Sequence, residues 1–275
     1  MGSTLESGLN WSLIAAVNND AIWQSCVLRS PDIATARAVI AQRGFASAAT
    51  AYNAGITATD SDLLVLAHQD VYFPAGWVAA LRATVAWLDA HDPNWGVLGL
   101  WGITPSGAGA GFVYCGATRQ ILGGPFAGVA EVTTLDEVVL ILRKSSGLRF
   151  DEQLDHFHMY GADICLQAQE RGMKCYSIPA LAVHNTNGYN LLPAEFWKAY
   201  GYMRRKWAAQ LPVVTSCTTI TKWGWPMLRW NLARMKNLIL RRHHPGQRVS
   251  DPAILHQELL ASGRLPAAPT SEPAR

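Results

Sequence analysis

The stretch Leu63-Leu64-Val65-Leu66-Ala67-His68-Gln69-Asp70 decides the fold of this chain. Five apolar residues run without interruption and are followed by three polar ones. A short, continuous apolar run is typical of a central strand in a parallel sheet, because such a strand is buried on both faces. Ligands of these sheets bind beyond the carboxyl ends of the strands. The run therefore predicts a buried strand and a functional edge that begins at His68.

Segments on both sides of this run alternate between strand-like and helix-like patterns. Residues 77–90, for example, carry apolar side chains at helical spacing. Such alternation predicts an α/β fold, with a Rossmann-type, mainly parallel sheet flanked by helices. We expect further strands at residues 11–17, 38–41, 97–101, 138–142, 175–178 and 182–183, and further helices at residues 47–57 and 162–171.

The composition excludes several classes of protein. Hydrophobic residues make up 49% of the 275 residues and charged residues only 16%, which excludes general disorder. No apolar run approaches the roughly 18 residues of a membrane span, and the start of the chain lacks the pattern of a secretory signal. The five cysteines show no CxxC spacing, so we expect neither a zinc knuckle nor a disulfide framework. We therefore expect a reduced, cytoplasmic protein.

Charge is distributed unevenly along the chain. The net charge is +3, but residues 1–197 carry 10 basic and 17 acidic residues, a net −7. Residues 198–275 carry 13 basic and 3 acidic residues, a net +10. An acidic body with a basic tail indicates carboxylates available for a metal in the body and an anionic partner for the tail.

The chain is expected to divide into three parts. Residues 10–212 form the α/β domain. Residues 213–250 form a basic, Trp-rich, helical extension, and residues 251–275 form a flexible tail.

The helical extension has the profile of a helix that lies on a membrane surface. Contact through residues 222–242 would attach the protein peripherally to the cytoplasmic face of a membrane. Packing of the helix on the α/β domain is an equally weighted alternative. The tryptophans are Trp223, Trp225 and Trp230, and the apolar residues at helical spacing are Leu232, Met235, Leu238 and Ile239.

His68 and Asp70 form the sharpest candidate site. Alternate residues of an extended chain point the same way, so both side chains can converge on one ion. An imidazole with a carboxylate suits Mn²⁺ or a similar divalent metal better than Ca²⁺. Taken alone, however, such a tripeptide is more often a solvated loop. His184 also follows a short apolar strand, and it joins this site if the fold brings it near Asp70.

Residues 151–163 hold four carboxylates and two imidazoles, just before and into a predicted helix. A helix N-terminus favours anions and helps to keep a carboxylate deprotonated, as a general base requires. Helix capping by Asp163 together with a solvated acidic loop is an equally weighted alternative. The GxGxxG spacing fails at Phe112, and neither a GxxxxGK[ST] phosphate loop nor a GxSxG nucleophile elbow occurs.

The ordered set of these motifs resembles the nucleotide-sugar-dependent glycosyltransferases with the GT-A fold, in the broad family 2 group. The set runs from the Asn18-Asn19 turn through His68-Gln69-Asp70 and Asp136-Glu137 to the helix around Asp163 and to His184. The resemblance covers about residues 11–190. It points to a bacterial subset with His-Gln-Asp in place of the usual acidic DxD motif.

This resemblance implies a metal site and a nucleotide-binding edge. Asp70 matches the metal-binding Asp of the DxD motif, and His184 matches a His that closes the metal site. His68 stands where the family has the first Asp and is a further candidate ligand for Mn²⁺ or Mg²⁺. The candidate nucleotide-binding residues are Val17, Asn18, Asn19, Asp20, Asn53, His68 and Gln69.

The resemblance leaves the general base open. The Glu-Asp pair that commonly supplies the base in the family reads Tyr160-Gly161 here. The candidates are Asp163, Asp155 and Asp136. We prefer Asp163, because it is the only carboxylate left in the motif.

The implied activity is that of a metal-dependent, hexosyltransferase-like, inverting glycosyltransferase. It would move a sugar from a nucleotide diphosphate, most commonly UDP, to a hydroxyl of a glycan or lipid-linked acceptor in cell-envelope polysaccharide synthesis. The missing Glu-Asp pair keeps a degenerate nucleotide-sugar- or carbohydrate-binding module as the alternative. A nucleotidyltransferase is disfavoured, because Asn18-Asn19-Asp20 is no glycine-rich basic loop. The acidic body argues against a nucleic-acid partner.

Overall fold

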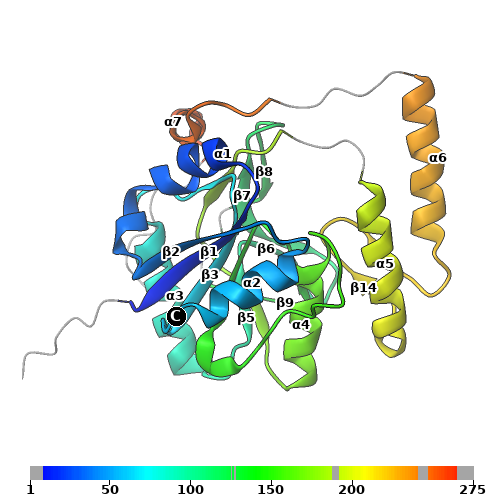
Figure 1. The fold of residues 1–275 in the computed structure, drawn as a ribbon, viewed down its shortest axis with the longest axis horizontal. Coiled ribbons are helices and arrows are strands. Elements are labelled where there is room, and N and C mark those ends of the chain that lie inside the picture. The colour runs from blue at the N-terminus through cyan, green and yellow to red at the C-terminus, as the bar shows by residue number, and fades with distance from the viewer. Residues whose placement is uncertain (1–8, 125, 127, 188–191, 241–246, 265–275) are drawn as a thin grey trace, which may run out of the picture.

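The computed structural model describes residues 9–124, 126, 128–187, 192–240 and 247–264. Two sheets and the helices around them make up the α/β body, and one long helix stands at its periphery (Figure 1). Among the described residues, no helix combines the length and the apolar character needed to cross a bilayer.

The larger sheet has seven strands in the order β2-β1-β3-β11-β5-β12-β9. The pairings make β2, β1, β3, β5 and β12 run in one direction, whereas β11 and β9 run in the opposite one. The expected mainly parallel sheet is therefore confirmed. In sheet order, the strands are Ala38–Arg43, Trp11–Val17, Leu63–His68, Val139–Arg143, Val97–Gly99, Cys175–Ser177 and Ala130–Val132.

Strand β3 is buried on both faces, which explains its uninterrupted apolar sequence. Successive side chains of a strand point to opposite faces. Leu64 and Leu66 accordingly pack into one core, and Val65 and Ala67 pack into the other. All four side chains are almost completely shielded from solvent. Helices must cover both faces of the sheet here, because exposing the apolar side chains of either face to water is unfavourable.

Helices cover the two faces of the larger sheet (Figure 1). The core that holds Leu64 includes residues of α2, α4 and α5, and the core that holds Val65 includes residues of α1 and α3. These helices are α1 (Asp20–Ser25), α2 (Ala48–Thr57), α3 (Trp77–His91), α4 (Tyr160–Glu170) and α5 (Ala194–Lys206). Short 3₁₀ turns occupy Val27–Arg29, Pro31–Thr35, Lys144–Ser146 and Ala208–Gln210.

A second sheet follows the order β10-β6-β7-β13-β4, and β8 pairs with β7. The strand expected at residues 97–101 splits between the two sheets at Leu100. Glycine is required where the strands of this second sheet approach closely: a Cβ on Gly111 would lie 2.1 Å from the carbonyl oxygen of Leu100. The strands are β4 (Val71–Tyr72), β6 (Trp101–Ile103), β7 (Gly109–Cys115), β8 (Gln120–Gly123), β10 (Thr134–Leu135) and β13 (Ala182–His184).

The C-terminal part differs from the expected division of the chain. A small hairpin of β14 (Val213–Val214) and β15 (Thr219–Ile220) precedes helix α6 (Trp225–Ile239). Val213 and Ile220 are buried in the same core as α5, so this hairpin belongs to the α/β body and the predicted boundary at residue 213 is too early.

Part of the predicted flexible tail is also ordered. Residues Pro252–Ala261 form helix α7, in which Leu255 and Leu259 are fully buried against Tyr72 and Tyr114. Leu255 and Leu259 lie four residues apart, on one side of this helix, and they pack on a matching apolar patch of the second sheet. Residues 265–275 lie outside the described part of the chain.

Helix α5 is joined to helix α4 by a buried ion pair. The Asp163 carboxylate, only 1% exposed, lies 2.7 Å from Nζ of Lys206. The indole of Trp207 donates to the same carboxylate at 2.8 Å, and the amide of Gln167 donates at 2.7 Å. A buried charge is tolerated only when it is paired and hydrogen-bonded, and these contacts meet that condition.

Replacing Lys206 with methionine should destabilise the protein strongly. The change leaves the Asp163 carboxylate buried without its counter-ion, and such a loss costs about 3 kcal/mol of unfolding free energy. Urea denaturation of the variant would measure it. Lys198→Met is the matched control, because Lys198 is an exposed lysine of the same helix. Equal denaturation midpoints for the two variants would contradict the assignment.

Candidate functional site

The ends of two parallel strands, β1 and β3, bring residues of the predicted nucleotide-binding edge close together. Strands β1 and β3 pair so that Ala16 lies opposite His68. Gln69 links the turns that follow them: its Oε1 accepts from the backbone N–H groups of Asn18 at 3.1 Å and Asn19 at 3.0 Å. Its Nε2 also donates to Oδ1 of Asn18 at 2.6 Å. The first turn is therefore held in place by a side chain of the second.

A pocket of about 390 Å³ lies at this edge, within the usual size range of small-ligand sites. Four of the predicted nucleotide-binding residues line it: Val17, Asn18, His68 and Gln69. The other lining residues come from distant parts of the chain. They are Ala16, Gln42, Gly44, Phe45, Tyr52, Asp70, Phe157, His158 and Tyr160.

Three predicted nucleotide-binding residues, Asn19, Asp20 and Asn53, are not among the described residues that line this pocket. Asn19 caps helix α1, where its side chain accepts a hydrogen bond of 3.2 Å from the backbone N–H of Ile22. Asp20 instead forms a surface ion pair of 2.6 Å with Arg43. Asn53 exchanges two hydrogen bonds of 2.9 Å with the backbone of Phe150. These contacts hold neighbouring segments of the protein together, and a role of these residues in nucleotide binding stays a prediction.

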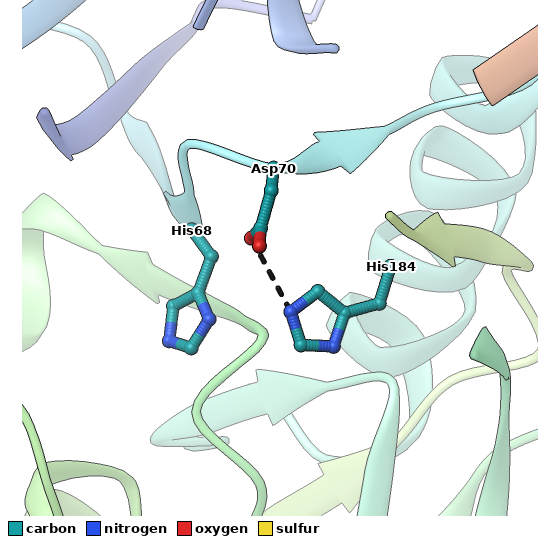
Figure 2. Close-up of side chains that lie close together, drawn as sticks. All are labelled: His68, Asp70 and His184. Atoms are coloured by element: carbon teal, nitrogen blue, oxygen red, sulfur yellow. Dashed lines mark ion pairs between the residues drawn. The ribbon is translucent and has the colours of Figure 1, made fainter. Parts of the chain in front are cut away.

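His68, Asp70 and His184 lie close together (Figure 2), and the first two of them line the pocket. Each offers one ligand atom, and these atoms all lie within 4.8 Å of one another. Asp70 follows β3 directly. His184 arrives from β13, which pairs with β4 so that His184 lies opposite Val71. The second sheet thus joins residues more than a hundred positions apart in the sequence.

Burial and neighbouring charges shift the pKa values of all three side chains in this cluster. Burial by itself would raise the pKa of Asp70 and lower that of His184, but the attraction between them outweighs it. The pKa of Asp70 is therefore held well below its usual range, and that of His184 is raised. Burial and the neighbouring His184 lower the pKa of His68 to about 4, so this imidazole is neutral at pH 7. The hydroxyl of Tyr160 lies 2.9 Å from Nε2 of His68 and orients its ring.

Arg248 reaches this cluster from the C-terminal segment. Its Nη2 lies 2.8 Å from Oδ2 of Asp70, and its Nε donates to the carbonyl oxygen of Asn185 at 2.9 Å. Asn185 is buried and exchanges hydrogen bonds of 2.9 and 3.1 Å with the backbone of Val249. The segment before α7 is therefore tied to the edge of the pocket, and it adds a fixed positive charge there.

A second, smaller pocket of about 60 Å³ borders the first and shares His158 with it. Asp136 and Glu137 line it. Asp136 accepts a hydrogen bond of 2.7 Å from the hydroxyl of Ser216. Burial, reinforced by Asp136, raises the pKa of Glu137 well above its usual range, although backbone N–H groups at the start of α4 counteract this. Two acidic side chains therefore face one small cavity.

Of the three predicted general bases, Asp136 is the one placed at a described pocket. Asp163 is held in the buried network with Lys206 and Trp207 instead. Asp155 is exposed in the loop before α4. The motif around Asp163 gives no indication that Lys206, 43 residues later in the chain, pairs with this carboxylate.

Three residues of the site were missed as functional candidates. Arg248 lies far along the chain in the basic tail, with no local motif to single it out. Glu137 belongs to the Asp136-Glu137 motif that the resemblance places at the acceptor pocket, but it is not among the predicted site residues. His158 is one of the two imidazoles in the acidic segment, and only the fold shows that it lines both pockets.

This fold and site define an α/β protein of the GT-A class. A model of the Glycosyltransferase like family matches residues 12–187. The chain belongs to that family.

The fold has distant relatives among solved structures. The crystal structure of GalNAc-T7 with UDP, GalNAc and Mn²⁺ aligns with a TM-score of 0.53 and 11% identity, over 74% of this chain and 49% of that one. The crystal structure of S. aureus TarS aligns with a TM-score of 0.46 and 13% identity, over 72% of this chain and 39% of that one.

A curated relative shares part of the sequence. The ATP synthase subunits region ORF 6 of Fuscovulum blasticum is 29% identical over 124 residues, or 42% of this chain and 48% of the relative. The chain thus spans about half the length of this relative.

Gly161 stands where the resemblance places the missing Asp, and the structure explains the glycine. A Cβ at this position would lie 2.8 Å from the carbonyl oxygen of Leu135 and 3.0 Å from Cγ of Glu137. The segment that carries the acidic pair of the small pocket therefore packs directly on the backbone of α4.

Substituting alanine for Gly161 should destabilise the protein by about 1–3 kcal/mol, because the new methyl group overpacks this contact. Gly201→Ala is the control, since the nearest atom to a Cβ there is Nη1 of Arg205 at 3.7 Å. That change should stabilise helix α5 by up to about 1 kcal/mol. Urea denaturation measures both, and shifts of the same sign would contradict the packing argument.

Proposed function

We propose that this protein is a metal-dependent, inverting glycosyltransferase that uses a nucleotide-diphosphate sugar, with UDP-sugars the first donors to test. The acceptor would be a hydroxyl of a glycan or lipid-linked molecule of the cell envelope. The observation that carries the proposal is the cluster of His68, Asp70 and His184 at the edge of the 390 Å³ pocket. Membership of the family supports it, as does the fold shared with GalNAc-T7, a protein solved with UDP, GalNAc and Mn²⁺.

The donor atoms of the cluster fit a divalent transition metal. Two imidazoles and one carboxylate suit Mn²⁺ better than Mg²⁺, which prefers oxygen ligands alone. His68 is neutral at pH 7, as ligation requires, whereas the raised pKa of His184 opposes the neutral form that a metal would need. A bound cation would act as a Lewis acid on the departing diphosphate. His68, Asp70 and His184 would hold it.

The other residues at the edge would orient the donor. Val17 and Asn18 line the wall at the end of β1, and Gln69 keeps their turn in one position. Tyr160 fixes the ring of His68 through its hydroxyl group. The guanidinium of Arg248 lies beside Asp70, where it would attract the negative charge of a diphosphate.

Asp136 would act as the general base. It lines the small pocket that borders the donor pocket, and it is exposed enough there to meet an acceptor hydroxyl. Removal of the hydroxyl proton on the side opposite the diphosphate favours in-line attack, which inverts the anomeric centre. General-base catalysis of this kind contributes about 10²–10⁴-fold to a rate.

A non-catalytic nucleotide-sugar- or carbohydrate-binding module remains the second candidate function. One observation favours it: Gly161 supplies no carboxylate at its position in the motif, and the carboxylate of Asp163 is paired with Lys206. A nucleotide-sugar-binding module and an enzyme both bind the donor, but only the enzyme cleaves it and so produces free nucleotide. Release of free nucleotide therefore distinguishes the two functions.

Incubation with UDP-, GDP- and dTDP-sugars should release nucleotide slowly from one donor class when Mn²⁺ is present. A chelator should abolish the release, and Asp70→Ala should abolish both the release and Mn²⁺ binding, measured by calorimetry. Asp60→Ala is the control, since Asp60 is an exposed aspartate. Donor binding without release, with and without candidate acceptors, would favour the binding module. Absence of any donor binding would refute the transferase and the nucleotide-sugar-binding module, and would leave the carbohydrate-binding module to be tested with free glycans.

Asp136→Asn should lower turnover by about 10²–10⁴-fold while leaving the dissociation constant of the donor nearly unchanged. The amide keeps the shape of the side chain but does not take up a proton at neutral pH. Asp155→Asn is the matched control, because Asp155 is exposed in the loop before α4. If the Asp155 variant loses activity and the Asp136 variant keeps it, the assignment of the base is wrong.

A further inference from the structure

Helix α6 carries a continuous apolar stripe that is exposed to solvent. Trp225, Leu228, Leu232, Met235 and Ile239 follow one another at intervals of 3, 4, 3 and 4 residues, so they lie on one side of the helix. Each of these side chains is between 49% and 77% exposed. Figure 1 shows α6 at the periphery of the molecule, beside α5.

Basic side chains of the same helix lie beside this stripe. Arg229 and Lys236 each follow a stripe residue, are exposed, and so border the stripe on one side. Lys222 lies just before the helix, with its Nζ 5.6 Å from the ring centroid of the exposed Trp223. Residues 198–248 contain 11 basic residues and no acidic one. The partner of the stripe must therefore be apolar where it meets the helix and anionic around it.

We infer that α6 lies flat on an anionic lipid bilayer, with this stripe facing the acyl chains. Basic side chains beside an apolar stripe extend toward lipid headgroups while their methylene groups stay on the apolar surface. Tryptophans at the start of the helix suit the boundary between headgroups and acyl chains. The helix has 15 residues, hence a length of about 22 Å, which is short of the roughly 30 Å of a hydrocarbon core. It is therefore a surface helix.

A second copy of the chain fits the stripe less well. Spacing of 3 and 4 residues also occurs in coiled coils, where opposite charges beside the seam set the pairing. Helix α6 contains no Asp or Glu, so a pair of these helices would bring arginine and lysine residues together without a counter-charge. Like charges at such positions oppose association.

Flotation of the full-length protein with lipid vesicles tests this inference without measuring activity, so the result is independent of the proposed glycosyl transfer. We expect at least fivefold more protein on vesicles of phosphatidylcholine with 30% phosphatidylglycerol than on phosphatidylcholine alone. Raising the salt concentration should reduce that binding, because the lipid charge is screened. Arg229→Gln with Lys236→Gln should reduce it as well.

The apolar stripe has its own test. Leu232→Glu with Met235→Glu should abolish binding to the anionic vesicles. The control pair is Ile254→Glu with Leu260→Glu on α7, which adds the same charge at exposed apolar positions of another helix. This pair should bind vesicles like the unmodified protein.

Two outcomes would overturn the inference. One is equal flotation of the two double variants. The other is absence of vesicle binding together with a dimer, detected by sedimentation velocity, that the stripe variant converts to a monomer; the stripe would then be covered by a second copy of the chain.

Discussion

The complete burial of strand β3 is the constraint on which the rest of the molecule depends. Neither face of Leu63–His68 presents polar side chains to water before its last residue, so helices must cover both faces of the sheet. Polar side chains are possible only where the strand ends. The functional edge is therefore a consequence of the core: it begins at His68 because the burial stops there.

The buried charge of Asp70 then connects three parts of the chain. A carboxylate with so little exposure needs counter-charges, and it finds them in His184 on β13 and in Arg248 before α7. The same contacts place a guanidinium and the imidazole of His184 beside Asp70, which lines the larger pocket together with His68. One electrostatic requirement of folding thus assembles the groups that a metal and a diphosphate would meet.

The carboxylates of this chain fall into two groups: some stabilise the fold, and others face a pocket and are available for chemistry. The charge of Asp163 is balanced by Lys206 inside the protein, and these contacts hold α5 against α4. Asp136 and Glu137 face a cavity, and the glycine at position 161 gives them room beside the helix. The acceptor side of the proposed reaction would then lie on the segment before β11. Helix α6, at the periphery, would bring this body to a membrane surface, where the proposed lipid-linked acceptor would lie.

The sequence by itself determined the fold class, because the period of its apolar residues sets which strands and helices can bury their surfaces. It also identified His68, Asp70 and His184 as one possible site, since each follows an apolar strand. Only the tertiary structure decided which carboxylates face a pocket, that Asn53 serves the loop around Phe150, and that residues 252–261 pack as a helix. Those outcomes depend on contacts between residues distant in the chain, such as Asp163 with Lys206 and Asp70 with Arg248. A local sequence pattern does not show which distant residue will be the partner, because the two charges come close together only after the chain has folded.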